Sequence, residues 1–85
     1  MKVVILMGGN SKERQVSLKS GNAIYRACKN IGYDTLIIDM IDDIDFYLNE
    51  LKKYDIVFIG LHGGEGENGT IQKTLEQNKI IFTGS

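Results

Sequence analysis

The sequence predicts an α/β fold, a three-layer sandwich built around a four-stranded parallel sheet. Short apolar runs alternate along the chain with longer stretches of helical periodicity, the pattern of strand–helix–strand units. The apolar runs are nearly continuous, as expected of parallel strands covered on both faces. Since 85 residues form at most one domain with a modest core, we expect a single domain over residues 1–85.

The first half of the chain predicts a strand, a helix and a second strand. Residues 2–7 (KVVILM) are an apolar run that ends at Gly8-Gly9-Asn10. A helix is predicted from there to about Asn30, with Gly32 as its left-handed stop. Residues 34–39 (DTLIID) predict the second strand. The expected buried face of the helix follows the spacing of its small and apolar side chains: Val16, Ser20, Ala23, Ile24, Ala27 and Ile31.

The next helix and strand lead into a glycine-rich loop. Residues 42–53 predict a helix whose acidic start suits the helix dipole. Residues 54–59 predict the third strand, which continues directly into the loop 60–70 (GLHGGEGENGT). The apolar face of the helix is expected to hold Ile44, Tyr47, Leu48 and Leu51.

The end of the chain predicts one more helix and one more strand. The helix spans residues 70–77 and is expected to be buried through Ile71 and Leu75. Asn78 is the expected left-handed stop, and residues 79–82 are the expected fourth strand.

The composition argues against several classes of function. A net charge of −1 and 25% charged residues leave no basic excess for binding nucleic acid or anionic membranes. No apolar run approaches the roughly 18 residues of a membrane span, and the N-terminus has no signal-peptide pattern. Cys28, the single cysteine, is expected in the core. We therefore expect a reduced, cytoplasmic protein with no nucleic-acid and no membrane partner.

Two loops are the candidate functional segments. Ligands of parallel α/β sheets bind beyond the carboxyl ends of the strands, and the loops 8–15 and 61–69 follow the first and third strands at that edge. Neither loop is a known phosphate-binding motif, because the next glycine after Gly9 is Gly21 and no G-K-[ST] occurs. One histidine and no paired cysteines give little support for a metal site.

Glu13 has two interpretations. Asn10-Ser-Lys-Glu13 fits a capping box at the start of a helix, and such patterns are common. Alternatively, the Glu13 carboxylate lies at the ligand edge of the sheet and pairs with a substrate ammonium. The flanking Lys12 and Arg14 are expected to be solvated.

His62, the only histidine, directly follows an apolar strand and is followed by glycines. It is either an ordinary polar residue or a hydrogen-bond partner for a carboxylate or a developing oxyanion. Gly63 and the neighbouring glycines form either a flexible turn or a set of backbone N–H groups aimed at a ligand. Glu65 and Glu67 argue against a bound phosphate. They fit better as carboxylates that support the loop by accepting hydrogen bonds from backbone amides, or as contacts to another part of a larger protein.

Three segments together resemble the N-terminal region of D-alanine–D-alanine ligases, ATP-grasp enzymes of peptidoglycan synthesis. Residues 8–18 (GGNSKERQVSL), followed by Ser20-Gly21, are similar to the family's G-G-x-S-x-E-[RH]-x-V-S-L-x-S-G. Residues 62–72 (HGGEGENGTIQ) are similar to H-G-x-x-G-E-[DN]-G-x-[LIV]-Q, and residues 82–85 (FTGS) to [YF]-T-G-S. Lys73 departs from the family, which usually has glycine or another small residue there.

The resemblance implies a Rossmann-like, pre-ATP-grasp domain that binds a substrate of an ATP-dependent ligase. In the full enzyme one D-alanine is activated as an acyl phosphate, and the amine of a second D-alanine attacks it, with loss of phosphate from a tetrahedral intermediate. ATP and magnesium (or manganese) would be bound by ATP-grasp domains outside this chain. The implied partners are D-alanine, those domains and a second subunit in a homodimer.

The resemblance also implies roles for particular residues. Glu13 matches the glutamate that binds the ammonium of the first D-alanine, and it is the one catalytic candidate. Val16 matches the residue that lines the methyl pocket, and Ser17 lies beside it at the helix start. His62 matches a histidine near the first substrate's carboxylate, and Gly63 is grouped with it as a substrate-binding residue.

Two other classes of function stay open on the sequence. One is the matching domain of a related ligase whose acceptor is D-lactate or D-serine, a choice made outside this segment. The other is a non-catalytic α/β binding or dimerisation module. In every case we expect residues 1–85 alone to have no ligase activity.

Overall fold

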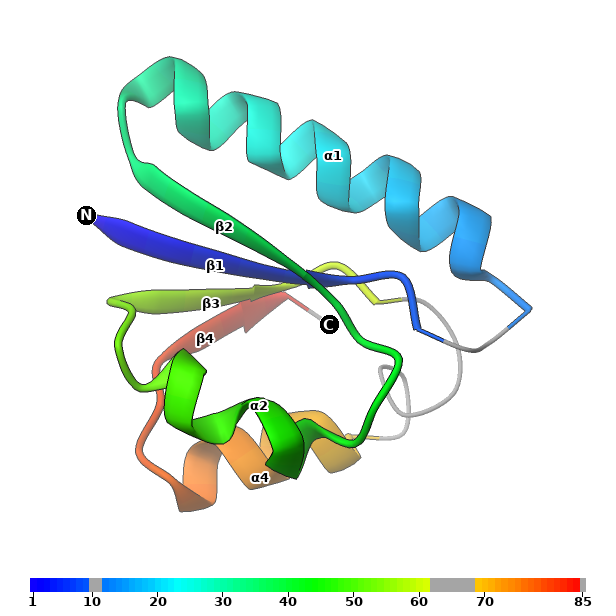
Figure 1. Ribbon diagram of the computed structural model, residues 1–85, viewed down its shortest axis with the longest axis vertical. Helices are drawn as coiled ribbons and strands as arrows, with labels where there is room; N and C mark the ends of the chain where they lie inside the picture. Colours follow the sequence, from blue (N-terminus) through cyan, green and yellow to red (C-terminus); the bar gives the residue numbers. More distant parts are fainter. Residues whose placement is uncertain (10–11, 62–68, 85) are drawn as a thin grey trace.

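The computed structural model describes residues 1–9, 12–61 and 69–84, which form four strands and three helices (Figure 1). Their order is β1 (Lys2–Met7), α1 (Arg14–Ile31), β2 (Asp34–Asp39), α2 (Ile44–Leu51), β3 (Ile56–Ile59), α4 (Thr70–Gln77) and β4 (Phe82–Gly84). The predicted alternation of strands and helices is confirmed.

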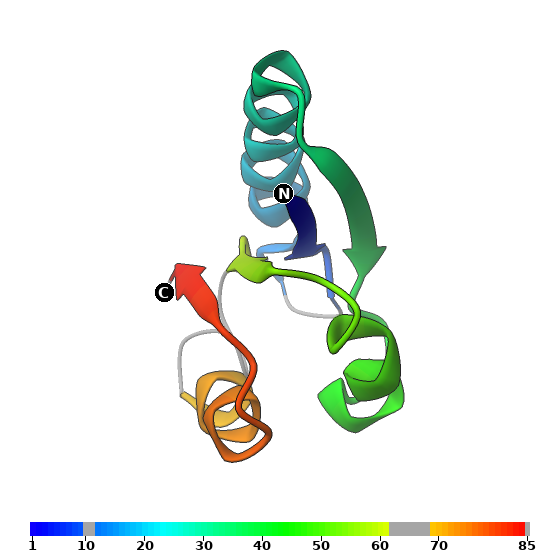
Figure 2. The same ribbon diagram turned by 90° about the vertical axis from the view of Figure 1, so that its left-hand side faces the viewer.

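All strand pairs are parallel, and the strand order is β2-β1-β3-β4. The chain therefore leaves β1 toward one side of the sheet and later enters β3 on the other side. Helix α1 covers one face of the sheet, whereas α2 and α4 cover the opposite face (Figure 2). The predicted three-layer α/β sandwich with a four-stranded parallel sheet is confirmed, and the β1–β3 pair is its switch point.

The α2/α4 face of the sheet holds the larger apolar core. Leu51, Leu75 and Ile71 are almost fully buried there, packed against Val4 and Leu6 of β1. The expected inner face of α2 is confirmed, because Ile44 and Leu51 are buried and Tyr47 and Leu48 pack against the same cluster. Large aliphatic side chains thus join β1, β3, α2 and α4.

On the α1 face the buried residues of the helix are small, whereas the larger Ile24 and Tyr25 of α1 are only partly buried against the same cluster. The buried residues of α1 are Ser17, Gly21 and Cys28, which face a cluster that includes Val3 and Ile5. A side chain at Gly21 would overlap Met7, so the helix backbone lies very close to the end of β1. Cys28 is buried as predicted.

The predicted buried face of α1 is wrong at most of its positions, although Ile24 packs against the cluster of Val3, Ile5 and Cys28 as predicted. Val16 is 50% exposed and Ile31 is 65% exposed, and Ala23 and Ala27 are exposed as well. The buried face is instead centred on Ser17, Gly21 and Cys28, because small residues let the helix lie close to the sheet. The apolar pattern of a sequence does not indicate how close a helix lies to a sheet.

Several element ends differ from prediction. Helix α2 is shorter than predicted, and β3 begins at Ile56 because the N–H of Tyr54 closes a turn with the Leu51 carbonyl, 3.1 Å away.

The fourth strand begins at Phe82 because the preceding residues end α4: the N–H of Ile80 bonds to the Leu75 carbonyl at 3.0 Å. Asn78 is not left-handed; Lys79 has the positive φ of 58° instead. The stop at Gly32 is confirmed, with φ of 95°.

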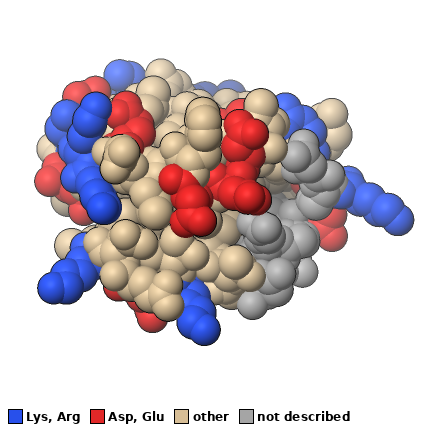
Figure 3. Space-filling view, turned by 60° about the horizontal axis from the view of Figure 1, so that its bottom comes forward, with Lys and Arg blue, Asp and Glu red and all other residues tan. Residues whose placement is uncertain are grey.

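Among the described helices, none combines the length and apolarity that crossing a membrane requires. On the face seen in Figure 3, Lys and Arg side chains are spread around the outline and interspersed with acidic ones. Lys73 lies exposed on α4, as expected for a lysine accommodated at a helix surface.

Candidate functional site

The candidate site lies at the carboxyl ends of β1 and β3, the neighbouring strands at the switch point. Gly8 and Gly9 follow β1, and Gly60 and Leu61 follow β3. Gly8 and Gly9 have φ of 80° and 82°, a conformation that other residues rarely adopt. The described residues that open the two expected loops thus lie at one edge of the sheet, at the ends of adjacent strands.

Ser17 ties the two strand ends together. Its hydroxyl accepts a hydrogen bond from the Gly8 N–H at 2.9 Å and donates one to the Gly60 carbonyl at 2.6 Å. The side chain is 0% exposed, so both backbone groups depend on it rather than on water. Ser17 therefore connects the start of α1 to both loops of the site.

Glu13 lies immediately before the first turn of α1. The helix begins at Arg14, so Glu13 is the N-cap residue and not the third helical residue that a capping box requires. Its side chain makes no capping hydrogen bond, and only its carbonyl enters the helix ladder, accepting from the Ser17 N–H at 3.0 Å. Glu13 therefore does not occupy the helical position that the capping-box interpretation gives it, whereas Asn10, the other residue of that box, lies outside the described residues. The Glu13 side chain is exposed at the ligand edge.

Val16 lies on the same first turn of α1 and is half exposed. Its exposure contradicts the predicted packing against the sheet but leaves it available to line a pocket.

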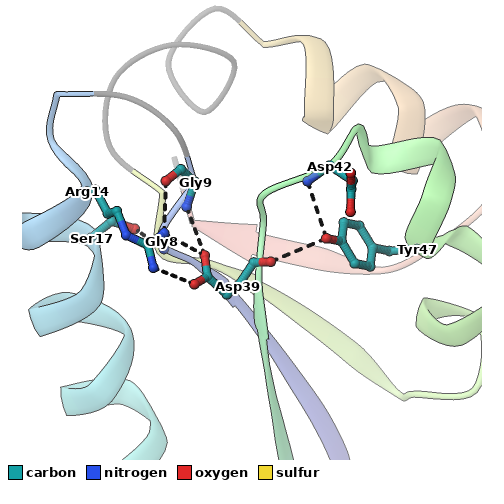
Figure 4. Close-up of polar contacts among 7 residues, drawn as sticks. All are labelled: Gly8, Gly9, Arg14, Ser17, Asp39, Asp42 and Tyr47. Carbon is teal, nitrogen blue, oxygen red and sulfur yellow. Dashed lines mark hydrogen bonds and ion pairs between the residues drawn. The ribbon is translucent and has the colours of Figure 1, made fainter.

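Arg14 was predicted to be solvated. Instead, its guanidinium forms an ion pair with the carboxylate of Asp39 at the end of β2 (Figure 4). Nη1 donates to Oδ1 of Asp39 at 2.8 Å, and Nη2 donates to Oδ2 at 2.6 Å. Nη1 also donates to the carbonyl of Gly9 at 2.9 Å, and Oδ1 accepts the Gly9 N–H at 3.2 Å. Both polar groups of Gly9 are therefore held by one ion pair.

The electrostatics follow from this geometry. The Arg14 guanidinium, through its hydrogen bonds, lowers the pKa of Asp39, and the Gly9 N–H acts in the same direction against the opposing effect of burial. Conversely, the Asp39 carboxylate raises the pKa of Arg14. Both side chains are 39% exposed. The pair is thus fully charged at neutral pH.

Asp39 is a site residue that the sequence interpretation missed. The available signal was its position, since an acidic residue at the carboxyl end of a parallel strand lies at the ligand edge. Its partner is 25 residues away in the chain, and only the packing of α1 across β1 and β2 reveals the pair.

Two of the predicted substrate-binding residues, His62 and Gly63, lie outside the described residues, as do Glu65 and Glu67. The structure therefore places Glu13 at the N-cap of α1, with Val16 and Ser17 on the first turn that follows, and leaves His62 and Gly63 as predictions. Within residues 1–9, 12–61 and 69–84, no three metal-binding side chains lie close enough together to hold an ion.

Comparison with known proteins points to one family. The sequence profile described as "D-ala D-ala ligase N-terminus" matches residues 2–54 and 46–85. D-alanine–D-alanine ligase of Thermotoga maritima is 42% identical over 85 residues, and that of Aquifex aeolicus is 46% identical over 85 residues. These matches cover 100% of this chain but only 28% and 29% of those two ligases.

Solved structures give the same result. The crystal structure of the Bacillus anthracis D-alanine–D-alanine ligase complexed with ATP matches with a TM-score of 0.84 and 35% identity. The match covers 100% of this chain and 29% of that one. D-alanyl-alanine synthetase A of Vibrio cholerae shares the fold, with a TM-score of 0.79 at 23% identity.

Proposed function

The chain belongs to the family of D-alanine–D-alanine ligase N-terminal domains, and from this we propose that it forms the wall of the first D-alanine site in such a ligase. The proposed reaction joins two D-alanines with consumption of ATP, through an acyl phosphate of the first, to supply peptidoglycan precursors. The observation that carries the proposal is the position of Glu13, an exposed carboxylate at the N-cap of α1 beside the switch point of the sheet.

The chemistry of the first turn of α1 suits one end of an amino acid. The Glu13 carboxylate would accept charge-assisted hydrogen bonds from the substrate ammonium. The half-exposed Val16 would contact the methyl group. Ser17 is fully buried and hydrogen-bonded, so it would act by fixing the loops rather than by offering its hydroxyl to a ligand. His62 and Gly63 complete the proposed site near the substrate carboxylate.

The polar side chains at this edge of the sheet include Glu13 and the Arg14–Asp39 ion pair. Our proposal assigns ATP and magnesium, as the family resemblance implies, to ATP-grasp domains outside this chain. A homodimer and a cytoplasmic location stay predictions.

The proposal can be tested in a chimera. This chain would replace the matching segment of the Thermotoga maritima ligase, to which it is 42% identical, and D-alanine-dependent ATP consumption would be measured. We expect an active chimera that keeps the acceptor preference of its parent, because the acceptor is chosen outside this segment. A chimera that binds ATP but turns over no D-alanine would favour a non-catalytic module instead. The 85-residue chain alone is expected to consume no ATP with D-alanine.

Within the chimera, Glu13→Gln isolates the proposed contact. We expect a rise of roughly tenfold or more in the KM for the first D-alanine, with a smaller change in the KM for ATP, because a charge-assisted contact to the ammonium is lost. Glu50→Gln is the matched control, since it removes a carboxylate at the far end of α2. An unchanged first-site KM in Glu13→Gln would remove Glu13 from the site.

A further inference from the structure

We propose that the Arg14–Asp39 ion pair is a positioning device that holds Gly9 and the first turn of α1, and with that turn Glu13, in the orientation the substrate site needs. The site it serves is that of the proposed function. Neither residue touches the substrate in this proposal; both act through the backbone of Gly9 and through the first turn of α1.

The ion pair binds both backbone polar groups of Gly9. Asp39 accepts the Gly9 N–H and Arg14 donates to the Gly9 carbonyl, so one pair of side chains fixes both ends of a left-handed residue (Figure 4). A side chain at Gly8 would overlap Oδ1 of Asp39, so the loop is also packed against the pair. The preceding N–H, that of Gly8, is held by Ser17 from the other side.

Asp39, to which Arg14 binds, is itself held in place by neighbouring groups. The carbonyl of Asp39 accepts a hydrogen bond from Tyr47 Oη at 3.3 Å, and the same oxygen of Tyr47 accepts the Asp42 N–H at 3.3 Å (Figure 4). The next residue, Met40, donates its N–H to the Met7 carbonyl at 2.8 Å. Asp39 is therefore held by α2 on one face of the sheet while its carboxylate reaches Arg14 on the other.

Glu13 directly precedes Arg14, so the rotation of the first helical turn that brings Arg14 to Asp39 also sets the direction in which Glu13 leaves the helix. Neutralisation of Arg14 by Asp39 matters as well. An uncompensated guanidinium one residue from Glu13 would repel an ammonium ligand.

A guanidinium and a carboxylate that meet through two hydrogen bonds fix their relative orientation, which a single contact between charges does not do. Arg14 and Asp39 meet through two bonds, 2.8 and 2.6 Å long. Lysine offers only a point charge at such a site and would lose this geometry. Charge alone is therefore not expected to substitute for the arginine.

The kinetic test uses the chimeric ligase described above. We expect Asp39→Asn and Arg14→Lys each to raise the KM for the first D-alanine about tenfold while kcat and the KM for ATP change less than about twofold. Asp39→Glu, which keeps the carboxylate, should recover part of the loss. Glu50→Gln, which breaks the exposed ion pair between Glu50 and Lys53 (3.2 Å), is the matched control and should leave all three parameters unchanged.

The double variant Arg14→Gln/Asp39→Asn separates position from charge. The double variant has no uncompensated charge at these two positions. A KM for the first D-alanine that stays raised therefore supports the positioning role, and a KM that returns to the wild-type value overturns that role. Equal changes in all three parameters, matched by Glu50→Gln, would also overturn the proposal, because they would indicate a general loss of stability.

A second measurement does not depend on ligase activity. Amide hydrogen exchange of the 85-residue chain should show the Gly9 N–H exchanging at least about tenfold faster in Asp39→Asn, with core amides of β1 unchanged. Unaltered exchange at Gly9 would overturn the positioning role. An inactive wild-type chimera with faster exchange at Gly9 would contradict the proposed ligase function alone, so the two failures are distinguishable.

Discussion

The two faces of the sheet are packed in different ways. The α2/α4 face is closed by large aliphatic residues such as Leu51, Ile71 and Leu75, which contact one another and β1 across the interior. On the α1 face the buried helix residues are the small Ser17, Gly21 and Cys28, with Ile24 and Tyr25 only partly buried beside them. The start of α1 is joined to the strand ends by hydrogen bonds and an ion pair. The first face provides apolar burial, and the second provides precise placement of a helix end.

This difference explains why the candidate site lies on the α1 side. Burial of large aliphatic groups stabilises a fold without fixing the direction of a particular side chain at its edge. Small residues permit close approach, and directional polar contacts then set the orientation of the first turn. Substitutions on the two faces should therefore separate loss of stability from loss of site geometry.

The largest effect is expected from a cavity on the α2/α4 face. Leu75→Ala removes a fully buried side chain and should lower the free energy of unfolding by about 2–5 kcal/mol, measured by urea denaturation of the 85-residue chain. Glu76→Ala, at an exposed neighbouring position, is the control and should change it by less than about 0.5 kcal/mol. A small effect of Leu75→Ala would mean that this face does not dominate stability.

The next effect is expected from Ser17→Ala. The substitution leaves the Gly8 N–H and the Gly60 carbonyl without their buried partner, and an unpaired buried group costs about 1–3 kcal/mol. In the chimera it should also raise the first D-alanine KM, whereas Leu75→Ala should not. If both variants change that KM equally, the proposed division between the two faces fails.

A smaller effect is expected from Gly21→Ala. The new methyl group would overlap Met7, and such overpacking costs about 1–3 kcal/mol, of which about 1 kcal/mol is offset by the better helix propensity of alanine. Asn22→Ala, on the exposed side of α1, isolates the propensity gain and should stabilise the chain. Equal stabilisation by the two substitutions would show that α1 does not approach the sheet closely.

The smallest effect is expected from the pH dependence of the Arg14–Asp39 pair. Since the pKa of Asp39 is lowered in the folded state, the pair stabilises the fold above the ordinary aspartate pKa of about 3.9, and this contribution disappears as the pH falls through the lowered value. Because both side chains are 39% exposed, solvent limits its size. The difference in unfolding free energy between the wild type and Asp39→Asn should shrink between pH 7 and pH 3. A difference independent of pH would contradict the charged pair.

The sequence predicted the strands well where the signal was local. The ranges 2–7 and 34–39 were predicted to the residue because each is a short apolar run bounded by turn residues. The helix 70–77 was also predicted to the residue, with Ile71 and Leu75 buried as expected. The fourth strand was displaced because residues before Phe82 end α4, and that competition depends on hydrogen bonds rather than on apolarity.

The candidate site was predictable in part. Position at the ligand edge and the motif around Glu13 pointed to the first turn of α1, which the structure places beside the switch point. Arg14 and Asp39 were not recognised, because each is an unremarkable charged residue until α1 is packed across β1 and β2.

The sequence by itself determined the alternation of elements, the fold class and the two loops at one edge, since all three follow from patterns within a few residues. The tertiary structure alone decided the strand order, the buried face of α1, and the contacts of Ser17 and Arg14 with groups up to 43 residues away. The physical reason is the range of the interactions. Apolar periodicity reflects a local preference, whereas close approach and directional hydrogen bonds exist only once distant segments have packed.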